Sequence, residues 1–170
     1  MSTPQSVTLR PAAADDESFL RDLFASTREA EFGFLDETQR EVLVAMQFNL
    51  QQRQYEAGYP EAEHSIILLE EGPIGRLFID EGAREITLVD IALLPDYRSL
   101  GIGTYLIEQL LDRATTAKKP VRLHVFKSNP AQGLYERLGF SKVGDEGMYL
   151  EMLRQPGAGA SGRMTSESDQ

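Results

Sequence analysis

The 170-residue sequence contains no cysteine. This absence excludes disulfides, cysteine-ligated zinc, iron–sulfur clusters and a thiol nucleophile, and it fits a reducing compartment. Histidine is scarce as well, since His64 and His124 are the only two. A metal site built from three histidines is therefore impossible, and a Ser-His-Asp triad has only two candidate bases.

Positive charge is also in short supply. The 17 Lys and Arg stand against 27 Asp and Glu, which gives a formal net charge of −10. Nucleic-acid binding rests on clustered basic side chains, and the densest basic spot is Lys118-Lys119. The longest aliphatic run, Ile66–Leu69, is far below the roughly 18 apolar residues of a membrane span. No signal peptide is visible, so we expect a cytoplasmic protein with no nucleic-acid or membrane partner.

The pattern of the chain predicts one domain over residues 1–154 and a disordered tail over residues 155–170. Between Val7 and Leu153, segments typical of strands and of amphipathic helices alternate. A first helix, capped by Asp15 or Asp16, is expected to carry Phe19, Leu20, Leu23 and Phe24 on its apolar face, and a helix starting near Asp36 is expected to bury Val42, Met46 and Leu50. The helix from Ile102 carries Leu106, Leu110 and Ala114 on one face, and Gly139 is expected to end the helix from Pro130. The expected strands cover residues 7–10, 65–70, 75–80, 86–94, 121–126 and 148–153, and the expected helices begin near residues 15, 36, 102 and 130. This order predicts a mixed sheet with helices on both faces.

One loop carries most of the chemical information. An apolar strand, Ile86–Leu94, runs through Pro95 into the loop Arg98–Gly103 and then directly into a helix. The first N–H groups of a helix have no intrahelical partner, and the helix dipole adds positive charge there, so such a loop favours an anion and above all phosphate. Gly101 and Gly103 let a ligand approach the backbone, and Arg98 supplies a charge-assisted contact.

Two familiar phosphate motifs do not fit this loop. The dinucleotide fingerprint requires a small residue where Leu106 stands, and no Gly-Lys-Ser/Thr tripeptide of a Walker loop occurs in the chain. On these residues alone, a tight turn without a ligand remains an equal alternative.

The segment Arg98-Ser99-Leu100-Gly101-Ile102-Gly103 has the form R/Q-x-x-G-x-G/A, and Asn129–Phe140 ends in Leu-Tyr-Glu-Arg-Leu-Gly-Phe. In this order the two segments resemble the motifs of the GNAT superfamily of acyl-CoA-dependent N-acyltransferases. The resemblance implies an α/β fold with a mixed, mostly antiparallel central sheet of about six to seven strands, flanked by about four helices. It also implies acetyl-CoA as co-substrate, with no metal.

The resemblance further implies where the cofactor would bind. The backbone of the strand before the loop would pair with the pantetheine arm, and the loop amides with Arg98 would hold the pyrophosphate. Asn129 matches a residue that contacts the cofactor near its pantetheine, although an N-cap preceding Pro130 explains it equally well. The implied cofactor residues are Ile91, Ala92, Leu93, Arg98, Ser99, Leu100, Gly101, Ile102, Gly103, Thr104 and Asn129.

Two residues are the catalytic candidates. Tyr135 matches the general acid that protonates the departing CoA thiolate, and packing at the edge of a short helix is its alternative role. Asp90 stands within an otherwise apolar strand, where a carboxylate is either paired or functional. It is a candidate base, and a structural hydrogen-bond acceptor is the equal alternative. Glu29 and Glu31 are weaker candidates, and His124 is expected to be an ordinary strand residue.

The acceptor is the least readable part. The resemblance implies that the acceptor binds near the first two helices, in a region that holds Glu29, Glu31, Phe32, Phe34, Gln47, Gln51, Arg53, Tyr55 and Tyr59. Its acidic and aromatic side chains suit a cationic amine, and an ordinary amphipathic helix with a solvated glutamine face is the alternative. The acceptor is expected to be a small-molecule or peptide amine. Transfer from a longer acyl-CoA, and a non-catalytic module that binds acyl-CoA or another protein, are the alternatives. By analogy a homodimer through edge strands is conceivable, with Met148–Leu153 as the pairing segment.

Overall fold

The computed structural model of the chain describes residues 6–158. Its strands are β1 (Val7–Pro11), β2 (Glu63–Leu69), β3 (Gly72–Glu81), β4 (Ile86–Leu93), β5 (Val121–Phe126), β6 (Ser141–Glu146) and β7 (Tyr149–Arg154). Its α-helices are α1 (Glu17–Thr27), α2 (Glu29–Phe32), α3 (Glu37–Gly58), α4 (Ile102–Ala117) and α5 (Gln132–Arg137), with short 3-10 turns η1 (Ala14–Asp16) and η2 (Pro95–Tyr97). The predicted mixed α/β fold is confirmed.

The strands form a seven-stranded sheet in the order β1-β2-β3-β4-β5-β7-β6. β4 and β5 pair in parallel from Ile86 to Leu88, whereas β5–β7 and β6–β7 are antiparallel. β6 was not among the expected strands; it is mostly exposed and has a bulge between Lys142 and Gly144. Because β7 lies between β5 and β6, the expectation that Met148–Leu153 is an edge strand is wrong.

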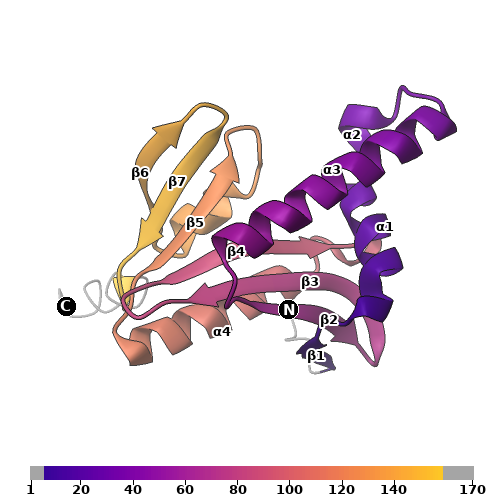
Figure 1. Cartoon of the computed structure of the whole chain (residues 1–170). Helices are drawn as coiled ribbons and strands as arrows, with labels where there is room; N and C mark the ends of the chain where they lie inside the picture. The colour runs from indigo at the N-terminus through magenta and orange to yellow at the C-terminus, as the bar shows by residue number, and fades with distance from the viewer. Residues whose placement is uncertain (1–5, 159–170) are drawn as a thin grey trace. The chain divides into compact units, whose positions relative to one another are not determined.

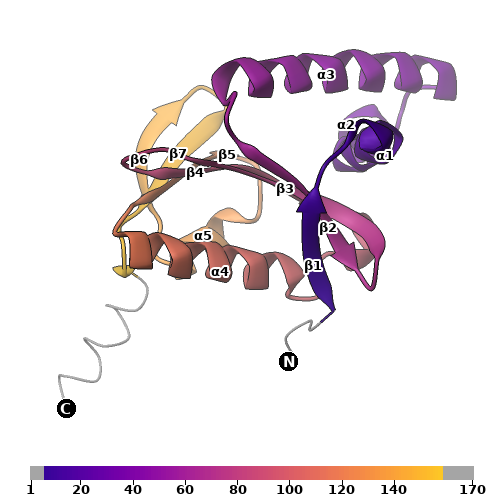
Figure 2. The same ribbon diagram turned by 60° about the horizontal axis from the view of Figure 1, so that its bottom comes forward.

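The chain divides into two compact units, and each is described by itself. The first comprises residues up to Ile79 together with Asp90–Gly103. Its core is formed where α1 and α3 pack together, as Figure 2 shows. Buried residues of this core are Leu20, Leu23, Phe24, Phe32, Val44, Phe48 and Ile66. Burial of large apolar side chains contributes roughly 1.5–3 kcal/mol each, so this cluster is the main stabilising feature of the unit.

The residues predicted to be buried are correct for α1 and wrong for α3. In α1, Leu20, Leu23 and Phe24 are buried as predicted. In α3, the three residues expected to be buried are about half or more exposed, at 54% for Val42, 62% for Met46 and 49% for Leu50. The helix instead buries Val44 and Phe48, and Asp36 caps its first turn by accepting a hydrogen bond from the Gln39 backbone N–H at 2.8 Å.

The start of α1 also differs in detail from the prediction of a helix capped by Asp15 or Asp16. The Asp16 carboxylate accepts hydrogen bonds from the Arg10 guanidinium and from the Ala13 backbone N–H, each at 2.8 Å. These donors hold the pKa of Asp16 at about 2, with the Arg10 hydrogen bond as the largest cause. Asp16 therefore fastens the entry into α1 to β1 and makes no side-chain cap of α1.

The second unit comprises Asp80–Val89 and the residues from Thr104 onward. Strands β5, β7 and β6 lie side by side in it, as Figure 1 shows. In α4 the predicted stripe is confirmed, because Leu106, Leu110 and Ala114 are all buried. After α5, Gly139 adopts a φ of 102° and the Phe140 N–H donates to the Tyr135 carbonyl, so the helix ends at the predicted glycine.

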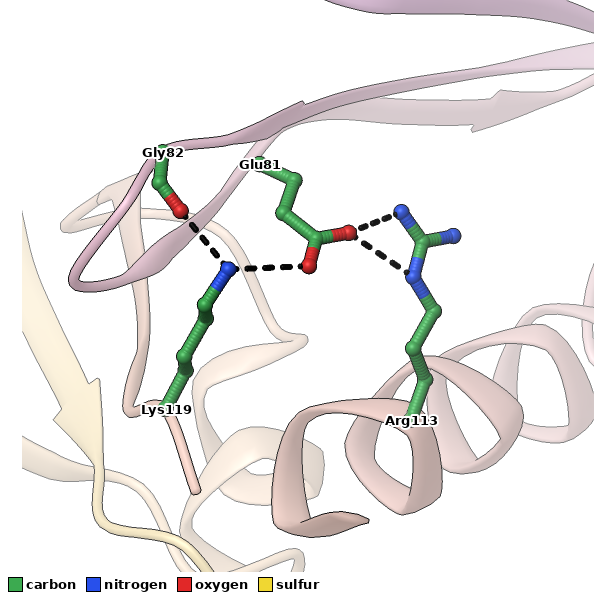
Figure 3. A network of polar contacts seen from close by, with 4 residues as sticks. All are labelled: Glu81, Gly82, Arg113 and Lys119. Carbon is green, nitrogen blue, oxygen red and sulfur yellow. Dashed lines mark hydrogen bonds and ion pairs between the residues drawn. The ribbon is translucent and has the colours of Figure 1, made fainter. Parts of the chain in front are cut away.

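A surface network fastens the β3–β4 turn to α4 within the second unit (Figure 3). Glu81 accepts hydrogen bonds from Arg113 of α4 and from Lys119, whose ammonium also donates to the Gly82 carbonyl at 2.8 Å. The Arg113 hydrogen bond is the largest cause of a lowered Glu81 pKa. A half-exposed ion pair of this kind contributes little energy.

The membrane and tail predictions concern the chain as a whole. Among residues 6–158, no helix is both long and apolar enough to cross a bilayer. Most of the predicted tail, residues 159–170, lies outside the described part of the structure. Within the described start of this tail, the Gly157 N–H donates a hydrogen bond to Thr115 Oγ1 at 3.0 Å. The division into one domain and a tail stays a prediction.

Candidate functional site

The segment from β4 to α4 has the geometry that the sequence predicts for an anion-binding loop. The Leu94 N–H donates to the Ile74 carbonyl at 2.8 Å and so ends β4 beside β3. One 3-10 turn, Pro95–Tyr97, follows, and α4 begins at Ile102. The loop therefore delivers the chain straight into the N-terminus of a 16-residue helix, whose first amides lack intrahelical partners.

Two residues of this loop have left-handed backbone. Gly101 has a φ of 88°, a left-handed conformation that glycine adopts without steric cost. Ser99 has a φ of 62°, a conformation that costs an L-residue about 1–2 kcal/mol. Such strain in a serine persists only where the surroundings impose it, so the loop conformation is strongly determined.

The Arg98 side chain is folded back onto its own unit. Its Nε–H donates to the Leu93 carbonyl at 2.9 Å, and Nη2 donates to Ser26 Oγ at 3.2 Å. Arg98 thus connects the loop both to the end of β4 and to α1. The residue remains exposed, so its positive charge is accessible at the loop.

The backbones of β3 and β4 approach each other closely at Gly75. A Cβ at this position would lie 2.2 Å from the Ala92 carbonyl oxygen, a distance at which something must move. At Gly103, by contrast, the nearest atoms to an added Cβ are Leu93 Cδ1 at 3.9 Å and Ile91 Cδ1 at 4.0 Å. Ile91 and Leu93 therefore lie toward Gly103, and Ala92 packs against the α1–α3 core on the opposite face.

Asp90 is paired, one of the two roles considered for it, and its partner Arg76 was not predicted. Its Oδ2 accepts a hydrogen bond from Arg76 Nε at 2.8 Å, and Arg76 Nη2 lies 2.8 Å from the same oxygen as an ion-pair contact. The Arg76 side chain is only 4% exposed, whereas 26% of the Asp90 side chain is exposed. Burying an arginine is costly unless its charge and its donors are matched, so Asp90 stabilises buried Arg76 while part of its own side chain stays exposed.

The remaining Arg76 donors point to α3. Nη1 donates to Gln52 Oε1 at 3.0 Å, and Nη2 donates to Gln51 Oε1 at 2.6 Å. The Arg76 Cζ also lies 5.4 Å from the centre of the Tyr55 ring. Tyr55 and Gln51, two residues of the expected acceptor region, thus contact a cation that the protein itself supplies.

His64 lies beside this network. Its ring stacks on Phe78 with centroids 4.7 Å apart, and its Nε2 is buried with no hydrogen-bond partner within the described part of the chain. Burial, followed by the repulsion of Arg76, lowers the pKa of His64 to about 4. His64 is therefore neutral near pH 7 and is part of the packing of β2 against β3.

The other proposed functional residues lie in the second unit. Tyr135 is 8% exposed and packs edge-on against Phe140, with ring centroids 5.7 Å apart. Asn129 Oδ1 accepts a hydrogen bond from the Ala131 N–H at 2.8 Å. Asn129 lies three residues before α5, whose N-cap is Ala131, so the N-cap role considered for Asn129 is wrong and its side chain closes a turn instead.

The weaker candidates are distributed over the surface. Glu31 pairs with Arg28 at 3.9 Å, and Glu29 opens the short α2. His124 is exposed on β5 opposite Glu151. Three of the residues expected on the acceptor side, Phe34, Gln47 and Arg53, are exposed.

Arg76 is the functional candidate that sequence reasoning missed. Its signal was present, because a lone arginine interrupts the apolar run of β3, just as Asp90 interrupts that of β4. Two opposite charges in adjacent buried strands predict an ion pair. Within residues 6–158, no three His, Asp or Glu side chains are grouped closely enough to hold a metal ion.

Comparison of the sequence with known proteins identifies a family and one curated relative. The sequence model described as the acetyltransferase (GNAT) family matches residues 20–140. A curated relative from Haemophilus influenzae, the [ribosomal protein bS18]-alanine N-acetyltransferase, is 38% identical over 60 residues. That match covers 35% of this chain and 41% of the relative, so the chain spans less than half of its length.

Solved structures share the fold at low sequence identity. PaiA N-acetyltransferase from Thermoplasma acidophilum, solved in complex with coenzyme A, has a TM-score of 0.66 and 19% identity, covering 89% of this chain and 99% of the other. An acetyltransferase from Thermus thermophilus has a TM-score of 0.65 and 21% identity, with coverage of 89% and 98%. At these identities the likeness concerns the fold alone.

Proposed function

Because the chain belongs to the acetyltransferase (GNAT) family, we propose that it is an N-acetyltransferase that transfers the acetyl group of acetyl-CoA to a primary amine in a ternary complex. The observation that carries the proposal is the loop Arg98–Gly103, which leads from β4 into the N-terminus of α4 with Gly101 in the left-handed region. This geometry suits a pyrophosphate. The CoA complex of the Thermoplasma relative supports the same ligand class.

In this proposal the cofactor is held by backbone more than by side chains. The amides of residues 99–104 hydrogen-bond the pyrophosphate, and Arg98 contributes its charge. The pantetheine arm pairs with the backbone of Ile91–Leu93. An N–H near Ile91 stabilises the oxyanion that forms on the thioester carbonyl. Asn129 keeps a side-chain N–H₂ for the pantetheine, since its hydrogen bond to Ala131 uses Oδ1.

The reaction then follows from acyl-transfer chemistry. The amine nitrogen attacks the thioester carbonyl carbon, a C–N bond forms, and the C–S bond breaks. The departing sulfur takes a proton, for which Tyr135 is the proposed donor, and the nitrogen loses one. Tyr135 regains its proton from solvent, so each turnover yields an N-acetyl amine and CoA.

Asp90 is proposed to contact the acceptor amine. Arg76 donates its Nε–H to Oδ2 and brings Nη2 to 2.8 Å from the same oxygen, and a guanidinium stays charged at any physiological pH. A carboxylate held in this way accepts a hydrogen bond from the amine and orients its lone pair. Water is then the final recipient of the amine proton.

The acceptor class stays broad: a small-molecule amine or the N-terminus of a peptide. The Haemophilus relative is named for an alanine of a ribosomal protein, which makes a peptide with N-terminal alanine a sensible first substrate. The acidic net charge of −10 favours cationic acceptors through long-range attraction.

The test is CoA thiol release with acetyl-CoA over a panel of amines that includes alanyl peptides, polyamines and lysine peptides. Wild-type protein should release thiol in proportion to the acetylated product found by mass spectrometry. Tyr135→Phe should lower kcat and leave the dissociation constant of acetyl-CoA nearly unchanged. Full activity of Tyr135→Phe would show that Tyr135 is not the acid, and binding of acetyl-CoA with no acetylation of any amine would favour a non-catalytic binding module.

A further inference from the structure

Arg76 is enclosed by groups from three different elements. It stands on β3, where it lies opposite Ile66 of β2, and its donors reach Asp90 of β4 and the glutamines 51 and 52 of α3. With 4% of its side chain exposed, it cannot reach solvent to bind a ligand directly. Arg76 can therefore affect the reaction only by positioning residues that it contacts, such as Asp90.

Arg76 contacts Asp90 in an asymmetric way, which indicates how Arg76 could position that carboxylate. Both guanidinium contacts fall on Oδ2, and the Asp90 side chain keeps 26% of its surface exposed. One oxygen is thus fixed in the protein while the side chain still reaches the surface.

We propose that Arg76 is the positioning residue of Asp90: it fixes Oδ2 so that Oδ1 accepts the N–H of the acceptor amine. Gln51 and Gln52 complete the arrangement by holding the guanidinium from α3, and Tyr55 covers its face at 5.4 Å. The last turns of α3 thereby belong to the acceptor side of the enzyme. This inference rests on the proposed function, and it assigns roles to Arg76, Gln51 and Gln52 that no motif of the sequence suggested.

The arrangement requires the shape of arginine and not only its charge. A lysine ammonium in this place is a point charge without the planar fork that serves a carboxylate and two amides at once. Arg76→Lys should therefore keep a cation beside Asp90 and still misplace the carboxylate. The matched control is Arg122→Lys, because Arg122 is a half-buried strand arginine paired with Glu85 and Glu151, to which no catalytic role is assigned.

A double-mutant cycle tests whether Arg76 acts through Asp90. With the fastest amine of the panel, Asp90→Asn and Arg76→Lys should each lower kcat/KM for the amine by about tenfold or more. The double variant should be no slower than Asp90→Asn alone. The dissociation constant of acetyl-CoA should stay constant throughout, and Arg122→Lys should retain the wild-type kcat/KM. Effects that multiply in the double variant, or an equal loss in Arg122→Lys, would overturn the proposal.

A second measurement covers variants that fold poorly and needs no acceptor. The Nε–H of Arg76, whose acceptor is Asp90 Oδ2, should exchange slowly with solvent in the proton–nitrogen NMR spectrum of the wild type, and faster in Asp90→Asn. Exchange in the wild type as fast as that of the exposed Arg53 would overturn the proposal even if the enzyme is active. If no amine is acetylated, the proposed function fails. Slow exchange of the Arg76 Nε–H would still show that Arg76 is held against Asp90.

Discussion

A single methyl group placed at either of two loop glycines should have opposite effects. Gly101 has a φ of 88°, so Gly101→Ala forces an L-residue into a left-handed conformation at a cost of about 1–2 kcal/mol. Gly103 has room for a Cβ, whose nearest neighbours would lie at 3.9 and 4.0 Å. It stands in the first turn of α4, where alanine is favoured over glycine by up to about 1 kcal/mol.

The two variants can be compared by thermal unfolding. For a chain of this size, 1 kcal/mol corresponds to roughly 2–4 °C in Tm. Gly101→Ala should therefore lower Tm by about 2–8 °C, and Gly103→Ala should raise it by up to about 4 °C. Acetyl-CoA affinity should fall in Gly101→Ala, because the loop amides move, and persist in Gly103→Ala. Equal effects of the two substitutions on Tm and on affinity would refute the argument from backbone geometry.

Three further predictions concern other parts of the first unit. Gly75→Ala should destabilise the protein by about 1–3 kcal/mol and weaken acetyl-CoA binding, because its Cβ would meet the Ala92 oxygen at 2.2 Å, whereas Gly58→Ala, with nothing within 4 Å, should be harmless in the same melt. Ser99→Gly should stabilise the protein by up to about 1 kcal/mol in urea unfolding, since glycine relieves the strain of a φ of 62° at an entropic cost of about 0.4–1 kcal/mol; a loss of stability would contradict the strain. The pKa of His64 is lowered to about 4 from 6.5, so the unfolded chain takes up the proton first, and stability that is complete above pH 6.5 should fall by roughly 3 kcal/mol as the pH drops to 4. His64→Phe should abolish that fall, and an unchanged pH profile would show that His64 is not its source.

The fold was most predictable where one physical requirement dominated a segment. In the body of α4, burial of one face dominates, and its stripe of Leu106, Leu110 and Ala114 is plain in the sequence. β6 was missed because an exposed strand with a bulge has no reason to alternate apolar and polar residues.

The error in α3 has a different physical reason. The C-terminal half of its inward face is polar, because Gln51 and Gln52 hydrogen-bond the buried Arg76. Apolar periodicity therefore indicated the opposite face, with Val42 and Met46, which is exposed. A helix that packs against a buried charge does not follow the usual hydrophobic pattern.

In the candidate site, too, local features could be predicted from the sequence and long-range contacts could not. The loop Arg98–Gly103 was predictable, because glycine spacing and a following helix are local features of the sequence. The environment of Asp90 was not, because it depends on residues 14 and 39 positions earlier in the chain, Arg76 and Gln51. A lone charge in each of two apolar strands was the available signal for that pair.

The central claim is that the loop Arg98–Gly103 binds an acyl-CoA, and the most direct test is the Tm with and without excess acetyl-CoA. At about a hundred times the dissociation constant, binding should stabilise the protein by roughly 2.7 kcal/mol, which is about 5–10 °C here. Adenosine alone should leave Tm unchanged. No shift with acetyl-CoA or with longer acyl-CoAs would contradict the account.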